Sequence, residues 1–89
     1  MQIKTARDLG ALVRDRRQAL GWTLDDLAER IPMSRRWLVD VEAGKPGAAV
    51  GPLLSLLAVL GVELSAALRE TSADVSLDSY LENLRKGTS

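Results

Sequence analysis

The chain has 89 residues, enough for one domain, and its 12 basic and 12 acidic side chains give a formal net charge of zero. It contains no cysteine and no histidine, which excludes disulfides, thiolate metal sites and histidine-based chemistry. We see no signal peptide at the N-terminus, and the apolar-rich residues 52–60 are too few to span a bilayer, so we expect a cytoplasmic protein. An enzyme is the least expected class, because no nucleophile–base pair or metal-ligand set is available.

The charge is distributed unevenly along the chain although it sums to zero. Residues 1–45 carry nine basic and seven acidic side chains, whereas residues 46–89 carry three basic and five acidic ones. This asymmetry is weak. Nucleic-acid binding therefore has to be argued from the position of individual basic residues and not from bulk charge.

Two helices are expected in the first thirty residues. The first covers residues 6–20, where apolar side chains recur at helical spacing after a Thr5 cap and before a glycine stop. The second begins after Thr23, and an aspartate three residues later completes a capping box. It is expected to end near Arg30, because Pro32 cannot lie inside a helix.

Two more helices follow. Ser34 is in position to cap a third helix over residues 35–43. Gly51 and Pro52 are interpreted as the cap and the first residue of a fourth helix, which ends at Gly61. Because leucines lie on most faces of this fourth helix, either it is deeply buried or one face awaits a second subunit.

The hydrophobic period changes to two after the fourth helix. Val62, Leu64, Ala66 and Leu68 alternate with other residues, a pattern typical of a strand. A lone strand would leave its backbone groups unpaired. We therefore expect antiparallel pairing with the same strand of a second protomer across a two-fold axis.

The remaining residues, 71–89, form a polar tail that we expect to be loosely held. Leu77, Tyr80, Leu81 and Leu84 would share one face of a short helix within it. Such a helix is marginal in isolation. Three interpretations stay open: the segment is disordered, it docks on its own domain, or it folds on binding a partner.

The second and third helices, joined by the turn Ile31-Pro32-Met33, match helix-turn-helix geometry. In that geometry the later helix offers its N-terminal turn to the major groove of DNA. Here the turn carries Arg35 and Arg36 directly after Ser34, and arginine is the best bidentate reader of guanine. We expect these two arginines to contact bases or phosphates, although they could be ordinary surface charge.

Two other residues of this helix have more than one interpretation. Trp37 either packs partly against the neighbouring turn or contacts a thymine methyl group or a sugar. Asp40 either accepts a hydrogen bond from a cytosine amine or anchors Arg36 four residues earlier, and we favour the anchor.

Residues 9–64 resemble the Cro/repressor (XRE) type of helix-turn-helix. The resemblance lies in the run from Leu12 through Gly21-Trp22-Thr23 and Leu27-Ala28, and in Val41-Glu42-Ala43-Gly44-Lys45. The continuation from Leu60 to Ser65, followed by a strand, is similar to the HipB-like antitoxin branch. The fold it implies is an all-α, lambda-repressor-like helix-turn-helix bundle with a short C-terminal β-strand that pairs across a dimer. Its parts are a DNA-binding domain (1–61), a dimerisation strand (62–70) and a tail (71–89).

The resemblance also implies roles for individual residues. The DNA-contacting positions are Thr23, Leu24, Ser34, Arg35, Arg36, Trp37, Asp40 and Lys45. An internal ion pair joins Arg17 and Glu42, and dimerisation involves residues 62–68. Two positions depart from the family pattern: Pro32 stands where glycine is usual in the turn, and Leu24 stands where a polar phosphate ligand is common. Because leucine cannot donate a hydrogen bond, that contact would fall to backbone amides.

The partners implied are an inverted-repeat operator in double-stranded DNA, a second copy of the chain and a toxin protein, for which a kinase of the HipA type is a candidate. No cofactor and no metal are expected. Bound to DNA, the protein would be associated with the nucleoid and would repress its own operon. The alternatives are a stand-alone phage-type or regulatory repressor, and a helical protein-interaction adaptor without DNA binding. The zero net charge and Leu24 favour the adaptor slightly.

Overall fold

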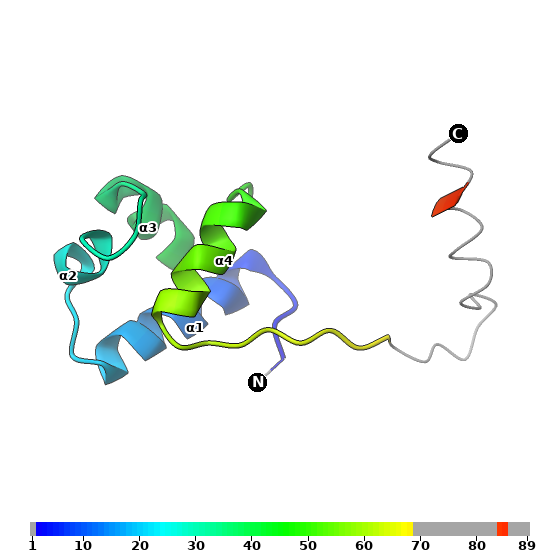
Figure 1. Ribbon diagram of the computed structural model, residues 1–89, viewed down its shortest axis with the longest axis horizontal. Helices are drawn as coiled ribbons and strands as arrows, with labels where there is room; N and C mark the ends of the chain where they lie inside the picture. The colour runs from blue at the N-terminus through cyan, green and yellow to red at the C-terminus, as the bar shows by residue number, and fades with distance from the viewer. Residues whose placement is uncertain (1, 69–83, 86–89) are drawn as a thin grey trace.

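The computed structural model describes residues 2–68 and 84–85. Four helices make up the fold of this part: α1 (Ala6–Ala19), α2 (Leu24–Ala28), α3 (Arg35–Glu42) and α4 (Val50–Val59) (Figure 1). Helix α3 packs against both α1 and α2. The arrangement confirms the all-helical, helix-turn-helix fold class predicted from the sequence.

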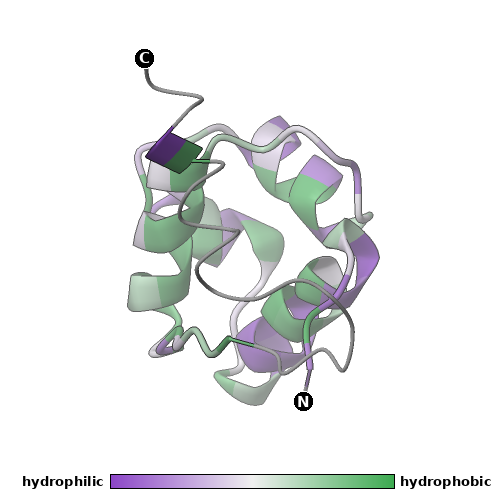
Figure 2. Ribbon diagram, turned by 90° about the vertical axis from the view of Figure 1, so that its right-hand side faces the viewer, coloured by the Kyte–Doolittle hydropathy of each residue, from purple (hydrophilic) through white to green (hydrophobic). Residues whose placement is uncertain are grey.

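One hydrophobic core lies where the four helices meet. Its buried side chains are Val13, Leu27, Ile31, Leu38, Val41, Leu56, Leu57 and Leu60. In Figure 2 the helices carry apolar residues beside hydrophilic ones, as expected of amphipathic helices around a shared core. Burying each such side chain stabilises the fold by about 1.5–3 kcal/mol relative to its exposed state. The core thereby fixes the relative positions of α2 and α3.

Three of the predicted helix N-caps are present. Thr5, Thr23 and Ser34 each accept a hydrogen bond from the amide three residues later, at 3.0–3.1 Å. At α2 the Thr23 amide also donates to the Asp26 carboxylate at 2.9 Å, which completes a capping box. These bonds satisfy backbone donors that have no partner inside the helix.

Helix α2 is shorter than the sequence indicated. It ends at Ala28, not near Arg30, and the Arg30 amide donates to the Leu27 carbonyl in a tighter turn. Pro32 disfavours helical backbone only at Ile31, so it does not account for the difference at Glu29 and Arg30, which form this turn. No non-glycine residue among those described has a positive φ, so the turn tolerates proline without strained backbone.

The start of α4 was predicted wrongly. The helix begins at Val50 with Ala49 as its cap, so Gly51 is not the cap and Pro52 is the third helical residue. The first helical amides have no intrahelical acceptor, so a proline there removes no helix hydrogen bond. The prediction placed the proline at the first helical position, where it is commonest, but the third position satisfies the same physical requirement.

Residues 62–68 leave α4 as an irregular segment, and no strand is assigned anywhere in residues 2–68 (Figure 1). The strand was predicted to pair with a second chain, so this part of the fold stays a prediction. Leu64 and Leu68 are exposed in the single chain. Residues 69 and 70 of the predicted strand lie outside the described residues.

The predicted tail helix is only partly covered by the structure. Leu77, Tyr80 and Leu81 lie outside the described residues, whereas Leu84 is exposed and helical. In the part of the chain that is described, no helix has the length and apolarity required to cross a membrane.

Candidate nucleic-acid interface

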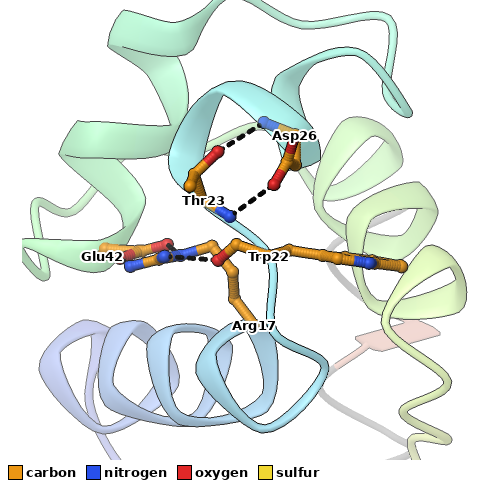
Figure 3. Close-up of polar contacts among 5 residues, drawn as sticks. All are labelled: Arg17, Trp22, Thr23, Asp26 and Glu42. Carbon is orange, nitrogen blue, oxygen red and sulfur yellow. Dashed lines mark hydrogen bonds and ion pairs between the residues drawn. The ribbon is translucent and has the colours of Figure 1, made fainter.

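A bidentate ion pair holds α1 against the end of α3. Arg17 Nε lies 2.8 Å from Glu42 Oε2 and Arg17 Nη2 lies 3.0 Å from Glu42 Oε1. The remaining terminal nitrogen, Nη1, donates to the Trp22 carbonyl at 2.8 Å (Figure 3). One guanidinium group therefore ties together α1, the link before α2, and α3. The pair expected from the family resemblance is thus present.

The environment of this pair favours the charged form of Arg17. Only 12% of the Arg17 side chain and 9% of the Glu42 side chain are exposed. The hydrogen bond from Arg17 to Glu42 raises the pKa of Arg17 above its ordinary value, so the guanidinium stays protonated at any relevant pH. Because both charges are matched and hydrogen-bonded, the pair is a rigid joint: it holds the α2–α3 unit in a fixed position on α1.

The two arginines of the candidate reading turn are exposed. Arg35 and Arg36 are the first two residues of α3, and their side chains are 59% and 76% exposed. Both are bound to carboxylates: Arg35 Nε lies 2.8 Å from Asp25 Oδ1, and Arg36 Nε lies 3.4 Å from Asp40 Oδ1. The arginines are therefore available at the surface and held in position there.

The Asp40 carboxylate forms ion pairs with two cations. Its Oδ1 atom lies 3.4 Å from Arg36 Nε and 3.3 Å from Lys45 Nζ. This contact agrees with the interpretation of Asp40 as an anchor for Arg36. It also connects α3 with the loop that follows, so Lys45 lies close to the exposed side of α3.

The other predicted contact residues differ in exposure. Trp37 and Leu24 are partly buried and pack against the core, so packing accounts for much of both side chains. Thr23 and Ser34 are exposed, and their hydroxyl oxygens already accept the capping hydrogen bonds. Each hydroxyl keeps its own proton as a donor for a phosphate oxygen.

A family model described as "Helix-turn-helix domain" matches residues 8–71. The chain belongs to this helix-turn-helix family. A relative, the uncharacterized HTH-type transcriptional regulator y4mF of Sinorhizobium fredii, is 43% identical over 63 residues, which cover 71% of this chain and 83% of the relative. These two matches place the chain among the helix-turn-helix transcriptional regulators and not among the enzymes.

Solved structures of low sequence identity share the fold. Chains from a HipA-HipB-O2-O3 complex and from a HipB-O4 20mer complex superpose with a TM-score of 0.70 at 18% identity. In both cases the match covers 79% of this helix-turn-helix chain and 99% of the other chain. The likeness therefore extends over nearly the whole of those chains.

Two residues that shape the helix-turn-helix unit were missed in the sequence. A β-carbon at Gly10 would collide with the backbone carbonyls of Val41 and Glu42, so α1 and α3 cross in close contact there. An isolated glycine inside a helical pattern was the available signal. Asp25 is an acid in the first turn of α2, and nothing in the sequence signals its contact with Arg35, which depends on how α2 and α3 are placed.

Arg16 is a third residue that was missed in the sequence, and no local pattern signals its role. Its Nε donates to the Leu60 carbonyl at 2.8 Å, across 44 residues. This places a positive charge at the C-terminal end of α4, where the helix dipole favours it. Arg16 thus fixes the point at which residues 62–68 leave the helix-turn-helix domain.

Proposed function

We propose that this protein is a dimeric transcriptional repressor whose α3 enters the major groove of an inverted-repeat operator. The observation that carries the proposal is the exposed Arg35-Arg36 turn on a helix whose inner face and far end are rigidly held. Two similarities support it: one relative is described as an HTH-type transcriptional regulator, and one similar fold comes from a HipB-O4 20mer complex. The repressor would act on the chromosome in the cytoplasm.

The contacts divide into base reading and phosphate binding. Arg35 and Arg36 stand where the recognition helix begins, the part that reaches base edges. Thr23, Ser34 and Lys45 flank this turn with hydroxyl and ammonium donors, which suit the DNA backbone. The Thr23 amide is already used by Asp26, so at the start of α2 a phosphate would meet the Thr23 hydroxyl and the next amides. The side chain of Leu24 would not donate.

A gel shift with duplex DNA from upstream of the gene tests DNA binding. Arg35→Ala and Arg36→Ala should each weaken binding by about 10- to 100-fold, and the affinity should fall steeply with salt. Arg14→Ala is the matched control, since Arg14 is exposed on α1 and should matter little. Absent binding, or binding that ignores salt and both arginines, would favour the adaptor function in place of the repressor.

Dimerisation is proposed to involve the outer face of α4 and residues 62–68. Val50 and Leu54 on α4 are exposed large apolar residues, and so are Leu64 and Leu68. A dimer would cover them and place two recognition helices about 34 Å apart, one turn of DNA. Leu64→Glu or Ser65→Pro should yield monomers with weak operator binding and intact helices. Light scattering that shows a tight dimer in both variants would exclude strand pairing as the main contact.

The finer proposal is that the repressor is an antitoxin. One of the similar folds comes from a HipA-HipB-O2-O3 complex, which is the support for a toxin partner of the HipA kinase type. The tail face of Leu77, Tyr80, Leu81 and Leu84 is the proposed docking segment. Co-expression with the neighbouring gene product should give a complex that survives purification. If nothing encoded nearby binds the chain, the stand-alone repressor remains.

A further inference from the structure

One ion pair joins the two helices of the helix-turn-helix unit directly. Asp25 is the second residue of α2 and Arg35 is the first residue of α3, and Asp25 Oδ1 lies 2.8 Å from Arg35 Nε. The Asp25 side chain is 77% exposed and that of Arg35 is 59% exposed. Exposed pairs contribute little to folding stability. The Asp25–Arg35 pair therefore matters more for the position of the Arg35 side chain than for the stability of the fold.

The contact uses one side of the guanidinium group. The printed contact involves Nε, and no hydrogen bond occupies the two terminal nitrogens of Arg35 within the described residues, so their donors remain available. Those terminal donors are the ones that form the bidentate contact with guanine O6 and N7. Asp25 can therefore restrict Arg35 through Nε while the terminal donors remain available to a base.

The pairing of Arg35 differs from that of four other exposed cations in the described part of the chain. Arg36 and Lys45 both pair with Asp40. These three residues lie on α3 or on the loop directly after it. Arg7 and Arg14, exposed on α1, have no carboxylate at ion-pair distance within residues 2–68 and 84–85. Of these five cations, only Arg35 pairs with a carboxylate on a different helix. This pairing restricts the position of Arg35 relative to both α2 and α3.

We propose that Asp25 is a positioning residue that orients Arg35 for reading one guanine, an inference that rests on the proposed DNA binding. Restricting the long side chain in advance reduces the conformational entropy that specific binding would otherwise cost. The same carboxylate repels the phosphates of arbitrary DNA when Arg35 has no guanine to bind. Asp25 therefore raises the ratio of specific to non-specific affinity without touching a base.

The test is selection from a pool of randomised duplexes of about 20 base pairs, two half-sites long. We compare the unmodified protein with Asp25→Asn, Arg35→Ala and the double variant. Asp15→Asn is the control, because it removes the same charge from an exposed α1 position. Arg35→Ala should reduce the preference at one base pair of each half-site by about tenfold or more, and Asp25→Asn should reduce it at the same base pair by about three- to tenfold.

The double variant should be no less selective than Arg35→Ala alone, because Asp25 acts through that arginine. Asp25→Asn should also bind arbitrary duplexes a few-fold more tightly, with a melting temperature within about a few degrees of the unmodified protein. Unchanged base preference in Asp25→Asn, or an equal change in affinity for all sequences, would overturn the positioning role and leave DNA binding intact. A pool that the unmodified protein does not enrich overturns the proposed function itself, and this role with it.

Discussion

Neutralising Glu42 is expected to be the most damaging single change of charge in the described part of this chain. In Glu42→Gln, Arg17 keeps its bond to the Trp22 carbonyl and one acceptor on the new amide, but loses its counter-charge. Removing one partner of a buried pair costs about 3–5 kcal/mol. Because both side chains keep roughly a tenth of their surface exposed and the amide still accepts, we expect about 2–3 kcal/mol.

Urea and thermal unfolding followed by circular dichroism measure this loss, at one fixed protein concentration because a dimer would link stability to concentration. For a domain of this size the loss corresponds to a fall of roughly 10–20 °C in Tm. Asp40→Asn is the control, since its exposed pairs with Arg36 and Lys45 should contribute less than about 1 kcal/mol.

The two charges of this pair are also expected to be energetically coupled. Arg17→Met should destabilise by a similar amount, since it leaves the Glu42 carboxylate without its partner. The double variant Arg17→Met/Glu42→Gln should recover much of that loss, because no unmatched charge remains. If Glu42→Gln costs less than about 1 kcal/mol, or if the two single losses simply add in the double variant, the pair is not the rigid joint described above.

The remaining predictions concern a helix contact, a helix cap and a long-range hydrogen bond. Gly10→Ala should lower the free energy of unfolding in urea by about 2 kcal/mol despite a better helix propensity, because the added β-carbon would collide with the Val41 and Glu42 carbonyls. Hydrogen bonds from Thr23 lower the pKa of Asp26. The stability that the ionised Asp26 carboxylate contributes is therefore fully present above the ordinary aspartate pKa of about 4, and it is lost as the pH falls through the lower native value. Asp26→Asn should flatten the dependence of stability on pH below about pH 4, as urea titrations at several pH values would show. Arg16→Met should cost about 1 kcal/mol and speed hydrogen exchange at the end of α4, where the Leu60 carbonyl loses its donor.

The helices and their caps could be predicted because both depend on local sequence. Thr5, Thr23 and Ser34 each accept the amide bond expected three residues on, whatever the rest of the chain does. The errors lie at the ends: α2 ends early before Pro32, and α4 begins before Gly51. Helix ends are decided by how the neighbouring backbone packs, which composition and spacing do not specify.

Some residues of the candidate site could be predicted from the sequence, and others could not. Arg35 and Arg36 were found from their place after a cap on the second helix of the unit. The Arg17–Glu42 pair came from family resemblance alone, because 25 residues separate the two and no periodicity connects them. The Asp25–Arg35 contact was not found by either route. It exists only once the core has set α2 and α3 at a fixed distance, so it is a property of the tertiary structure.

These contacts explain how a chain of zero net charge is compatible with DNA reading. Arg35, Arg36 and Lys45 lie within 3.4 Å of just two carboxylates, those of Asp25 and Asp40. Two negative charges therefore offset most of the field of three positive ones, and we expect weak attraction to arbitrary phosphates. In the proposed complex the terminal donors of Arg35 stay available beside Asp25, and guanine would offer them two acceptors in the required plane. On the proposed DNA-contacting face, acidic residues would thus favour selectivity over bulk affinity, and net charge would be a poor measure of DNA binding.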